Sequence, residues 1–219
     1  MTTLHSGVSD VKIQYLTKFV KAPSVLDLGA GNCQYSKWIK LMHPDIKITA
    51  VDHASSDVPD GVLFQCLDIE KKLPFEDQSF ETIIAFDILE HIDSVDNLLD
   101  ELFRVLKPGG IILGSVPHDE DHFLPAYNLT FYHRSDVTHK RYYVPKTLIK
   151  TVTKHGFINT ETWLEGGVSP AVFAEFFPRL IKPIVKKAIG LFRRLKIIRT
   201  DVLKSDLFFT AYKEDLRKL

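Results

Sequence analysis

The stretch that decides the fold runs over residues 24–42. It begins Ser24-Val25-Leu26-Asp27-Leu28-Gly29-Ala30-Gly31 and then carries apolar side chains at helical spacing, at Tyr35, Trp38, Ile39 and Met42. An apolar run, a glycine turn and an amphipathic segment in this order predict a strand, a tight turn and a helix. Glycines in such a turn let the backbone approach a ligand closely and direct amide groups at it. We therefore expect a ligand site at this turn.

The same alternation of strands and helices continues along the chain. Further strands are predicted over residues 46–51, 62–67, 80–86, 111–116, 157–163 and 207–212, and further helices over about 11–20, 95–106 and 148–156. The helix over 95–106 should end at Lys107-Pro108-Gly109-Gly110, because proline and glycine do not continue a helix. Short strands joined by helical crossovers build a mostly parallel sheet. We predict an α/β fold with a doubly wound sheet and helices on both faces.

Length and composition limit the class of protein. The 219 residues fit one domain over 1–219, with a leading helix in 1–21 and an insertion before the last strand in 166–205. The 28 basic residues equal the 28 acidic ones, so no overall field attracts nucleic acid.

Cys33 and Cys66 lie in segments predicted to form core, and no His/Cys group has zinc spacing, so we expect neither a disulfide nor a metal. With no apolar leader and no run of about 18 apolar residues, we expect a cytoplasmic protein.

Two positions distinguish between kinds of nucleotide ligand. The chain has Gln34 where the dinucleotide fingerprint G-x-G-x-x-G needs its third glycine, which disfavours a nicotinamide-dependent dehydrogenase. Asp52 follows the next strand, and a carboxylate there accepts both hydroxyl protons of a ribose. The pattern therefore indicates a nucleoside without a diphosphate.

Over about residues 22–165, and again in the last strand, the chain resembles the class I family of S-adenosylmethionine-dependent methyltransferases. The motifs that carry the resemblance are Val25-Leu26-Asp27-Leu28-Gly29-Ala30-Gly31-Asn32, Asp52, Asp68-Ile69, Phe86-Asp87-Ile88-Leu89-Glu90-His91-Ile92 and Leu106-Lys107-Pro108-Gly109-Gly110. The usual last glycine of the first motif is Cys33 here. The resemblance implies a Rossmann-like sheet of seven strands with the last one antiparallel, S-adenosyl-L-methionine as cofactor and S-adenosyl-L-homocysteine as product.

The resemblance also implies a set of cofactor-binding residues. These are Asp27 and Gly29 for the amino acid part, Gly31 for close approach, Asp52 at the ribose, Asp68 and Ile69 at the adenine, and Phe86, whose carbonyl would accept from the methionine amino group. Ala30 and His53 complete the set. From the residues alone, Asp52 and Asp68 have an alternative role as turn residues, since aspartate favours turns. Glu90 and His91 have the alternative of supporting the turn and the start of the next helix.

Methyl transfer from a sulfonium needs mainly alignment and exclusion of water, together with a base where the acceptor is a hydroxyl. Segments 118–122 and 136–143 are placed to supply that base. The second resembles the D-x-T-H-x-R stretch found in many small-molecule members of the family, so His139 is the first candidate catalytic residue and His118 the second. The alternative for His139 is that it locks its loop through hydrogen bonds.

Residues 179–199 carry basic side chains and no acid. The basic residues are Arg179, Lys182, Lys186, Lys187, Arg193, Arg194, Lys196 and Arg199, and apolar residues between them recur at helical spacing. This predicts a basic amphipathic helix, broken near its start by Pro178 and Pro183. It would pack as a lid or dimer contact, which we favour, or lie on an anionic membrane surface. In the membrane interpretation the acceptor would be lipid-linked, such as a quinone precursor or a glycolipid intermediate.

Two other functions compete with methyl transfer to a small-molecule or lipid- or sugar-linked acceptor. One is a regulatory module that binds S-adenosylmethionine without catalysis. The other is a nucleic-acid methyltransferase, which only the basic helix supports. The turn after the fourth strand reads Phe86-Asp87-Ile88-Leu89 instead of the Asn/Asp-Pro-Pro-aromatic signature used on flipped amino bases. We therefore predict O- or N-methylation of a small acceptor and no nucleic-acid partner.

Overall fold

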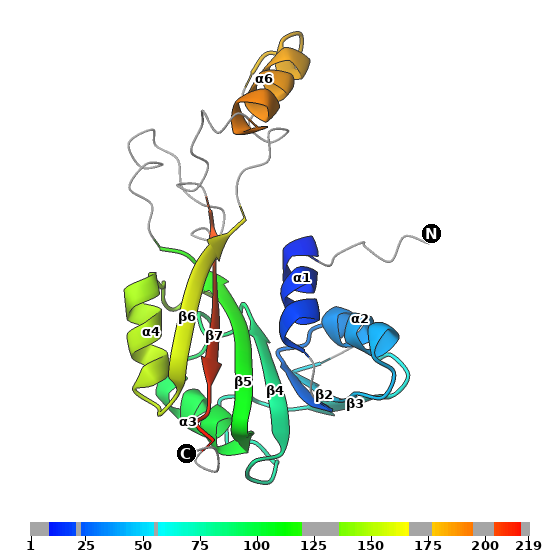
Figure 1. Cartoon of the computed structure of the whole chain (residues 1–219), viewed down its shortest axis with the longest axis vertical. Helices are drawn as coiled ribbons and strands as arrows, with labels where there is room; N and C mark the ends of the chain where they lie inside the picture. Colours follow the sequence, from blue (N-terminus) through cyan, green and yellow to red (C-terminus); the bar gives the residue numbers. More distant parts are fainter. Residues whose placement is uncertain are drawn as a thin grey trace.

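The computed structural model describes residues 9–20, 23–54, 57–119, 136–166, 177–194 and 204–215. Its centre is a seven-stranded sheet with the order β3-β2-β1-β4-β5-β7-β6 (Figure 1). The strands are β1 (Ser24–Leu28), β2 (Lys47–Asp52), β3 (Val62–Cys66), β4 (Phe80–Phe86), β5 (Leu106–Pro117), β6 (Ile158–Glu165) and β7 (Asp206–Tyr212). Neighbouring strands from β3 to β5 pair in parallel, and β7 runs antiparallel to both β5 and β6. The predicted mostly parallel sheet with an antiparallel last strand is confirmed.

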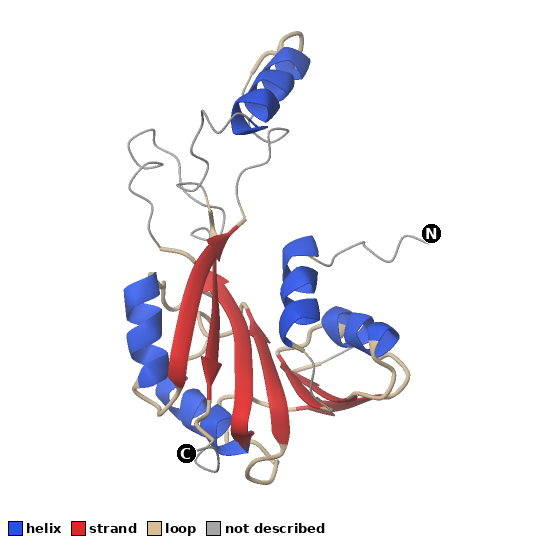
Figure 2. Cartoon of the chain, viewed as in Figure 1, coloured by secondary structure: helices blue, strands red, loops and turns tan. Residues whose placement is uncertain are grey.

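Helices cover both faces of this sheet, as predicted (Figure 2). They are α1 (Asp10–Phe19), α2 (Gln34–Met42), α3 (Val95–Val105) and α4 (Pro145–Thr153), while a further helix, α6 (Lys182–Arg194), does not lie on the sheet. Apolar side chains of α1 and α2, such as Leu16 and Ile39, form one buried cluster with the sheet. Those of α3 and α4, such as Leu102 and Leu148, form a second cluster on the opposite face. The doubly wound architecture therefore has two cores with the sheet between them.

The predicted end of α3 is correct, but the predicted start of β5 is wrong. The helix ends at Val105, and the strand begins at once with Leu106, which pairs with Phe80 of β4. The proline and glycines that follow stop the helix without forming a separate turn. They lie within the strand, where the register against β4 shifts and Gly109 has a φ of +77°. An irregularity in pairing accommodates these residues at the start of a strand.

The basic amphipathic helix forms, but it packs differently from the helices of the sheet. Figure 1 shows α6 beyond the ends of β6 and β7, away from the other helices. No residue of α6 whose side chain the structure describes is buried. The predicted break at Pro183 is wrong. Pro183 is the second residue of α6, and the first turn of a helix tolerates proline. Residues 195–199 of the predicted helix lie outside the described residues.

The apolar face of α3, which packs against the sheet, provides a test of the packing. Leu102 is fully buried between α3 and the sheet, so Leu102→Ala should lower the free energy of unfolding by about 2–5 kcal/mol through lost contacts and a cavity. Urea unfolding measures this loss. The matched control is Leu63→Ala, because the Leu63 side chain on β3 is 58% exposed and its loss should cost less than about 1 kcal/mol. Equal losses at the two positions would contradict the core assignment.

Candidate functional site

The site lies where the strand order reverses. Strand β1 has β2 on one side and β4 on the other, so the chain crosses to opposite sides of β1 as it builds the sheet. In an open parallel sheet, ligands bind at the carboxyl ends of the strands near this point. The turns that follow β1, β2 and β4 are therefore the first place to look for a ligand site.

The turn after β1 requires its glycines for two different reasons. Gly29 and Gly31 have φ values of +69° and +54°, which residues other than glycine rarely adopt. A Cβ atom on Gly29 would also lie 1.9 Å from Cδ1 of Ile88, whereas one on Gly31 would meet no atom within 4 Å. Gly29 therefore permits close packing of the turn after β4, and the backbone at Gly31 is open to a ligand.

Asp52 lies at this turn, as the sequence predicts. Its Oδ2 accepts a hydrogen bond of 2.7 Å from the backbone N–H of Gly31, and its Oδ1 accepts one of 2.6 Å from the backbone N–H of His53. Each carboxylate oxygen has about two acceptor positions, so one on each oxygen is left for a hydroxyl donor. Asp52 is therefore oriented by the turn and is still able to accept two ribose hydroxyls.

A pocket of about 180 Å³ adjoins this carboxylate. Its lining residues are Gly29, Asp52, His53, Leu67, Ile69, Ile88, His91 and Ile92, which come from the turns after β1, β2, β3 and β4. Most of these side chains are apolar. The volume is below the roughly 300 Å³ at which whole-ligand pockets begin, so the pocket suits part of a ligand, such as a flat purine base. The structure thus brings Gly29, Asp52, His53 and Ile69 together, four of the nine predicted cofactor residues.

Asp68 occupies a different position from its neighbours. Its carboxylate accepts a 3.1 Å hydrogen bond from the backbone N–H of Glu70 and lies 3.2 Å from Nζ of Lys71. These two contacts lower the pKa of Asp68. Leu67 and Ile69 on either side line the pocket, but Asp68 is not among its lining residues. The contact with adenine implied by the resemblance stays a prediction.

Asp27 is buried near the carboxyl end of β1. Its Oδ2 accepts a 2.5 Å hydrogen bond from Oγ of Ser36, a partner on α2 that the sequence analysis did not identify. Burial raises the pKa of Asp27 to about 6, despite the opposing effect of Ser36, and the charge of Asp52 adds to the rise. Such a charge, held at a cost inside the fold, is typical of a functional residue.

Phe86 ends β4 beneath a lysine that sequence reasoning missed. Nζ of Lys12, from α1, forms an ion pair with Asp87 and lies 5.1 Å from the centre of the Phe86 ring. Burial lowers the pKa of Lys12, but the neighbouring Asp87 carboxylate outweighs this and the pKa is raised. Ser115 also donates a 2.6 Å hydrogen bond to Asp87. Lys12 lies 75 positions from its partner, so no local sequence pattern could have revealed the pair.

The two candidate catalytic histidines are both largely buried, in different places. The His139 side chain is 6% exposed, its Nε2 lies 3.6 Å from Oδ2 of Asp136, and its ring centre is 4.7 Å from that of His91, a lining residue of the pocket. His118 follows β5, pairs with Tyr143 in a β-bridge and donates its backbone N–H to the carbonyl of Ser205. His139 is therefore the candidate with a contact to the pocket lining. Residues 120–122 of the first predicted segment lie outside the described residues.

Glu90 is the most unusual acid of the site. It is completely buried, and neither of its carboxylate oxygens has a hydrogen-bond partner among the described residues. Burial, reinforced by the charge of Asp87, raises the pKa of Glu90 to about 8. The sequence suggested that Glu90 and His91 support the turn. The backbone carbonyl of Glu90 does accept from the N–H of Lys140, but a turn role gives no reason to bury the carboxylate.

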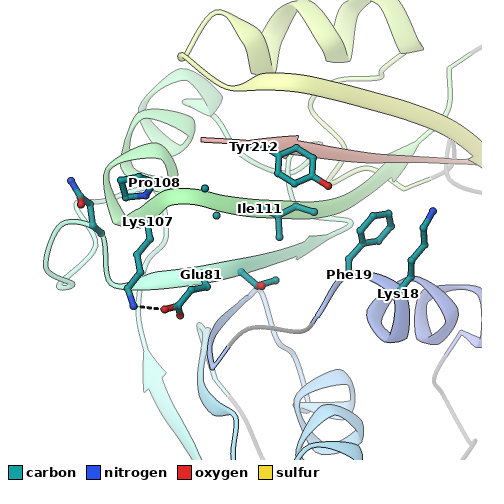
Figure 3. Close-up of a pocket in the computed structure, with 11 residues that line it drawn as sticks. Lys18, Phe19, Glu81, Lys107, Pro108, Ile111 and Tyr212 are labelled. Atoms are coloured by element: carbon teal, nitrogen blue, oxygen red, sulfur yellow. Dashed lines mark hydrogen bonds and ion pairs between the residues drawn. The ribbon is translucent and has the colours of Figure 1, made fainter. Parts of the chain in front are cut away.

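A second hollow, of about 610 Å³, lies at the other end of the sheet (Figure 3). Phe19, Ile111 and Tyr212 contribute its apolar lining, and Lys107 forms an ion pair with Glu81 at its edge. Glu81 and Lys107 belong to the beginnings of β4 and β5, so this hollow is at the amino ends of the parallel strands. None of the predicted site residues lines it.

An open α/β sheet with a glycine turn and an acid at its switch point is the architecture of Rossmann-like proteins. Residues 26–114 match a family model described as a methyltransferase domain. Over these residues the chain is similar to that family, and its fold is the one seen in solved S-adenosylmethionine-dependent methyltransferases.

Individual relatives cover different parts of the chain. A ubiquinone/menaquinone biosynthesis C-methyltransferase from Desulfotalea psychrophila is 29% identical over 120 residues, which are 50% of this chain and 46% of that protein. The phosphoethanolamine N-methyltransferase 2 of Haemonchus contortus, solved with phosphomonomethylethanolamine and S-adenosylhomocysteine, has a TM-score of 0.63 and 20% identity over 94% of this chain and 52% of that one. A SAM-dependent methyltransferase from Archaeoglobus fulgidus has a TM-score of 0.61 and 19% identity, with 92% and 90% coverage. The chain spans about half the length of the first two, and the structural likeness establishes the fold.

The charge of Asp27 gives a pH-dependent test. Because the folded-state pKa of about 6 exceeds the ordinary aspartate value of 3.8, the folded chain binds more protons between these values, and stability falls as the pH rises through them. Asp27→Asn removes this cost and should be more stable than the parent above pH 6, by roughly 3 kcal/mol, with a smaller gain at pH 5. Urea unfolding at pH 5 and pH 8 measures the difference, and Asp60→Asn reports the effect of removing an exposed charge. A gain that is the same at both pH values would contradict this account of Asp27.

Proposed function

We propose that the chain binds S-adenosyl-L-methionine and transfers its methyl group to a small or lipid-linked acceptor, as a cytoplasmic enzyme. The observation that carries this proposal is the arrangement of Asp52 beside an apolar pocket, with its Oδ2 accepting from the N–H of Gly31 in the turn after β1 and its Oδ1 accepting from the N–H of His53. A ribose at Asp52 would direct its base into the pocket and its 5′ substituent along the Gly29–Gly31 turn. The buried Asp27 and the Phe86 carbonyl are proposed to hold the amino acid end of the cofactor.

The relatives support a small acceptor without fixing its identity. The Desulfotalea protein is named as a C-methyltransferase of quinone biosynthesis, and the Haemonchus protein as an N-methyltransferase that was solved with a phosphorylated amine. The acceptor atoms therefore differ within the family. We assign activation of the acceptor to His139, the candidate that contacts the lining residue His91, and keep His118 as the second candidate.

Replacement of Asp52 tests the cofactor site directly. Asp52→Ala should weaken binding of S-adenosylhomocysteine by about 10- to 100-fold, because two charge-assisted hydrogen bonds are lost at about 1.5–3 kcal/mol each, partly offset by solvent. Isothermal titration measures the affinity, with Asp60→Ala as the control for an exposed aspartate, and Asp68→Ala tests the adenine contact. In thermal unfolding, S-adenosylhomocysteine at 100 times its dissociation constant should add about 2.7 kcal/mol to the parent, and NAD should add nothing. Unchanged affinity in Asp52→Ala would contradict the assigned site.

The competing functions make different predictions. A regulatory module that only binds would retain labelled cofactor without passing label to any compound of a metabolite extract. A nucleic-acid methyltransferase would need a basic binding surface, whereas the acids and bases of this chain balance and the turn after β4 lacks the signature for flipped bases. Transfer of label to a compound of the extract separates the enzyme from the binding module.

The membrane interpretation of α6 gains support over the lid. Ile184, Leu191 and Phe192 are exposed on α6, next to Lys186 and Lys187. A lid would bury such side chains against the body of the protein, whereas an interfacial helix keeps them available for lipid. Among the described helices, none is long and apolar enough to span a membrane.

The connection of α6 also suits a lipid-linked acceptor. The chain leaves β6 at Glu165 and returns at Asp206, so α6 extends from the end of the sheet at which the parallel strands terminate (Figure 1). The cofactor pocket lies at the same end. We propose that α6 lies on an anionic membrane and holds this end of the sheet toward the acceptor.

Liposome flotation tests this role of α6. The parent should float with vesicles that contain anionic lipid at low salt, and binding should fall at high salt and with neutral vesicles. Ile184→Glu should reduce binding at least about tenfold, because it removes apolar contact and adds a negative charge. The matched control is Leu63→Glu, which alters another exposed apolar residue, on β3. Flotation of neither the parent nor the control would contradict the membrane contact and return α6 to a protein contact.

A further inference from the structure

Two adjacent side chains and a third that is distant in the sequence converge beside the cofactor pocket. Glu90, His91 and His139 each offer one ligand atom, and these atoms all lie within 4.8 Å of one another. Glu90 and His91 belong to the turn after β4, and His139 belongs to the loop before α4. Two imidazole nitrogens and one carboxylate oxygen form a donor set that suits divalent first-row transition metals and leaves further coordination positions open.

The state of Glu90 is the second, independent observation. Its side chain is 0% exposed, and both carboxylate oxygens lack hydrogen-bond partners among the described residues. Burial of a carboxylate without a partner is strongly unfavourable, and an acid in such a place normally pairs with a cation. Lys140 of the facing loop does not fill this role, because its Nζ lies 2.6 Å from Asp93. Lys12 forms its ion pair with Asp87. A bound metal ion would supply the missing positive charge.

Hydrogen bonds behind the histidines prepare His91 as a ligand. The hydroxyl of Thr138 donates a 2.6 Å hydrogen bond to Asp136, so at its 3.0 Å contact with Nδ1 of His91 the hydroxyl oxygen accepts. The network therefore assigns the proton of His91 to Nδ1 and leaves the lone pair on Nε2. Asp136 also faces Nε2 of His139 at 3.6 Å, so this one carboxylate lies behind both rings. Carboxylates and hydroxyls behind histidine ligands are a recurring feature of metal sites.

The position of the cluster connects it to methyl transfer. His91 lines the proposed cofactor pocket, and the backbone N–H of Lys140 bonds to the carbonyl of Glu90 at 2.8 Å, which fixes the His139 loop against the turn after β4. A group bound at the cluster would therefore lie next to the cofactor.

We infer that Glu90, His91 and His139 bind one divalent transition-metal ion, which presents a hydroxyl oxygen of the acceptor to the methyl group of the cofactor. This inference rests on the proposed function and narrows its acceptor to a hydroxyl. Coordination lowers the pKa of the hydroxyl, whose proton leaves to solvent. The resulting oxyanion attacks the methyl carbon, an O–C bond forms and the C–S bond breaks, and its electron pair returns to sulfur to give the neutral thioether. The sequence has no zinc spacing and therefore predicts no metal. The three proposed ligands give no such spacing because their two segments meet only in the fold.

Metal binding to the whole chain tests the inference without an acceptor. Protein treated with a chelator and then dialysed against Mn²⁺ or Zn²⁺ in separate experiments should retain one ion per chain, measured by elemental analysis. Glu90→Gln and His139→Ala should each weaken binding at least about tenfold, and Thr138→Val, which removes the hydrogen bond to His91 but no ligand, should also weaken it about tenfold or more. His43→Ala, an exposed histidine at the end of α2, should bind as the parent does.

Binding of S-adenosylhomocysteine, measured on the same preparations, separates the two proposals. Retained affinity for this compound confirms that each variant is folded. Loss of metal together with retained S-adenosylhomocysteine binding in Glu90→Gln supports the site. If the parent holds neither metal, or if the variants hold it as tightly as the parent does, the metal site is wrong although the cofactor site stands. Failure of the parent to bind S-adenosylhomocysteine would instead overturn the proposed function.

Discussion

The hydrogen bonds that tie the turn after β1 to the end of β2 are the constraint on which the site depends. The backbone N–H groups of Gly29 and Ala30 both donate to the carbonyl of Val51, and that of Gly31 donates to the Asp52 carboxylate. These bonds satisfy three backbone donors in a turn that has a positive φ at Gly29 and Gly31, a conformation that favours glycine. They also orient the one carboxylate of the pocket lining. Any change in this turn would move the ribose-type acid and the packing at Ile88 together.

A second constraint joins the turn after β4 to the loop before α4. The bond from Lys140 to the Glu90 carbonyl, the contact of Thr138 with His91 and a 2.9 Å hydrogen bond from Arg141 to the carbonyl of Asp93 all cross this gap. The loop therefore takes its position from backbone groups of the turn. This explains how a segment without regular secondary structure holds His139 near the pocket.

The folded chain holds charge at a cost in the same region. Asp27 and Glu90 are both buried and have raised pKa values, and Lys12 is buried against Asp87. Acids kept out of water inside a fold destabilise it unless a ligand, metal or base compensates. Their concentration at the carboxyl ends of β1 and β4 agrees with a binding site at that edge, whereas the acid at the opposite edge, Glu81, is paired with Lys107.

The sequence by itself determined most of the elements, the type of sheet, the glycine turn and the position of Asp52 at the end of β2, because strand and helix periodicity and the glycine signal are local. It also selected His139 through the resemblance of its segment. Only the tertiary structure decided that Lys12 reaches Asp87, that Ser36 bonds to Asp27 and that Glu90 meets His139, since these partners come from different elements. The same holds for Asp68 and for α6, whose contacts depend on which surfaces the fold leaves available. Local patterns fix secondary structure, but burial and pairing of charges depend on segments brought together across the chain.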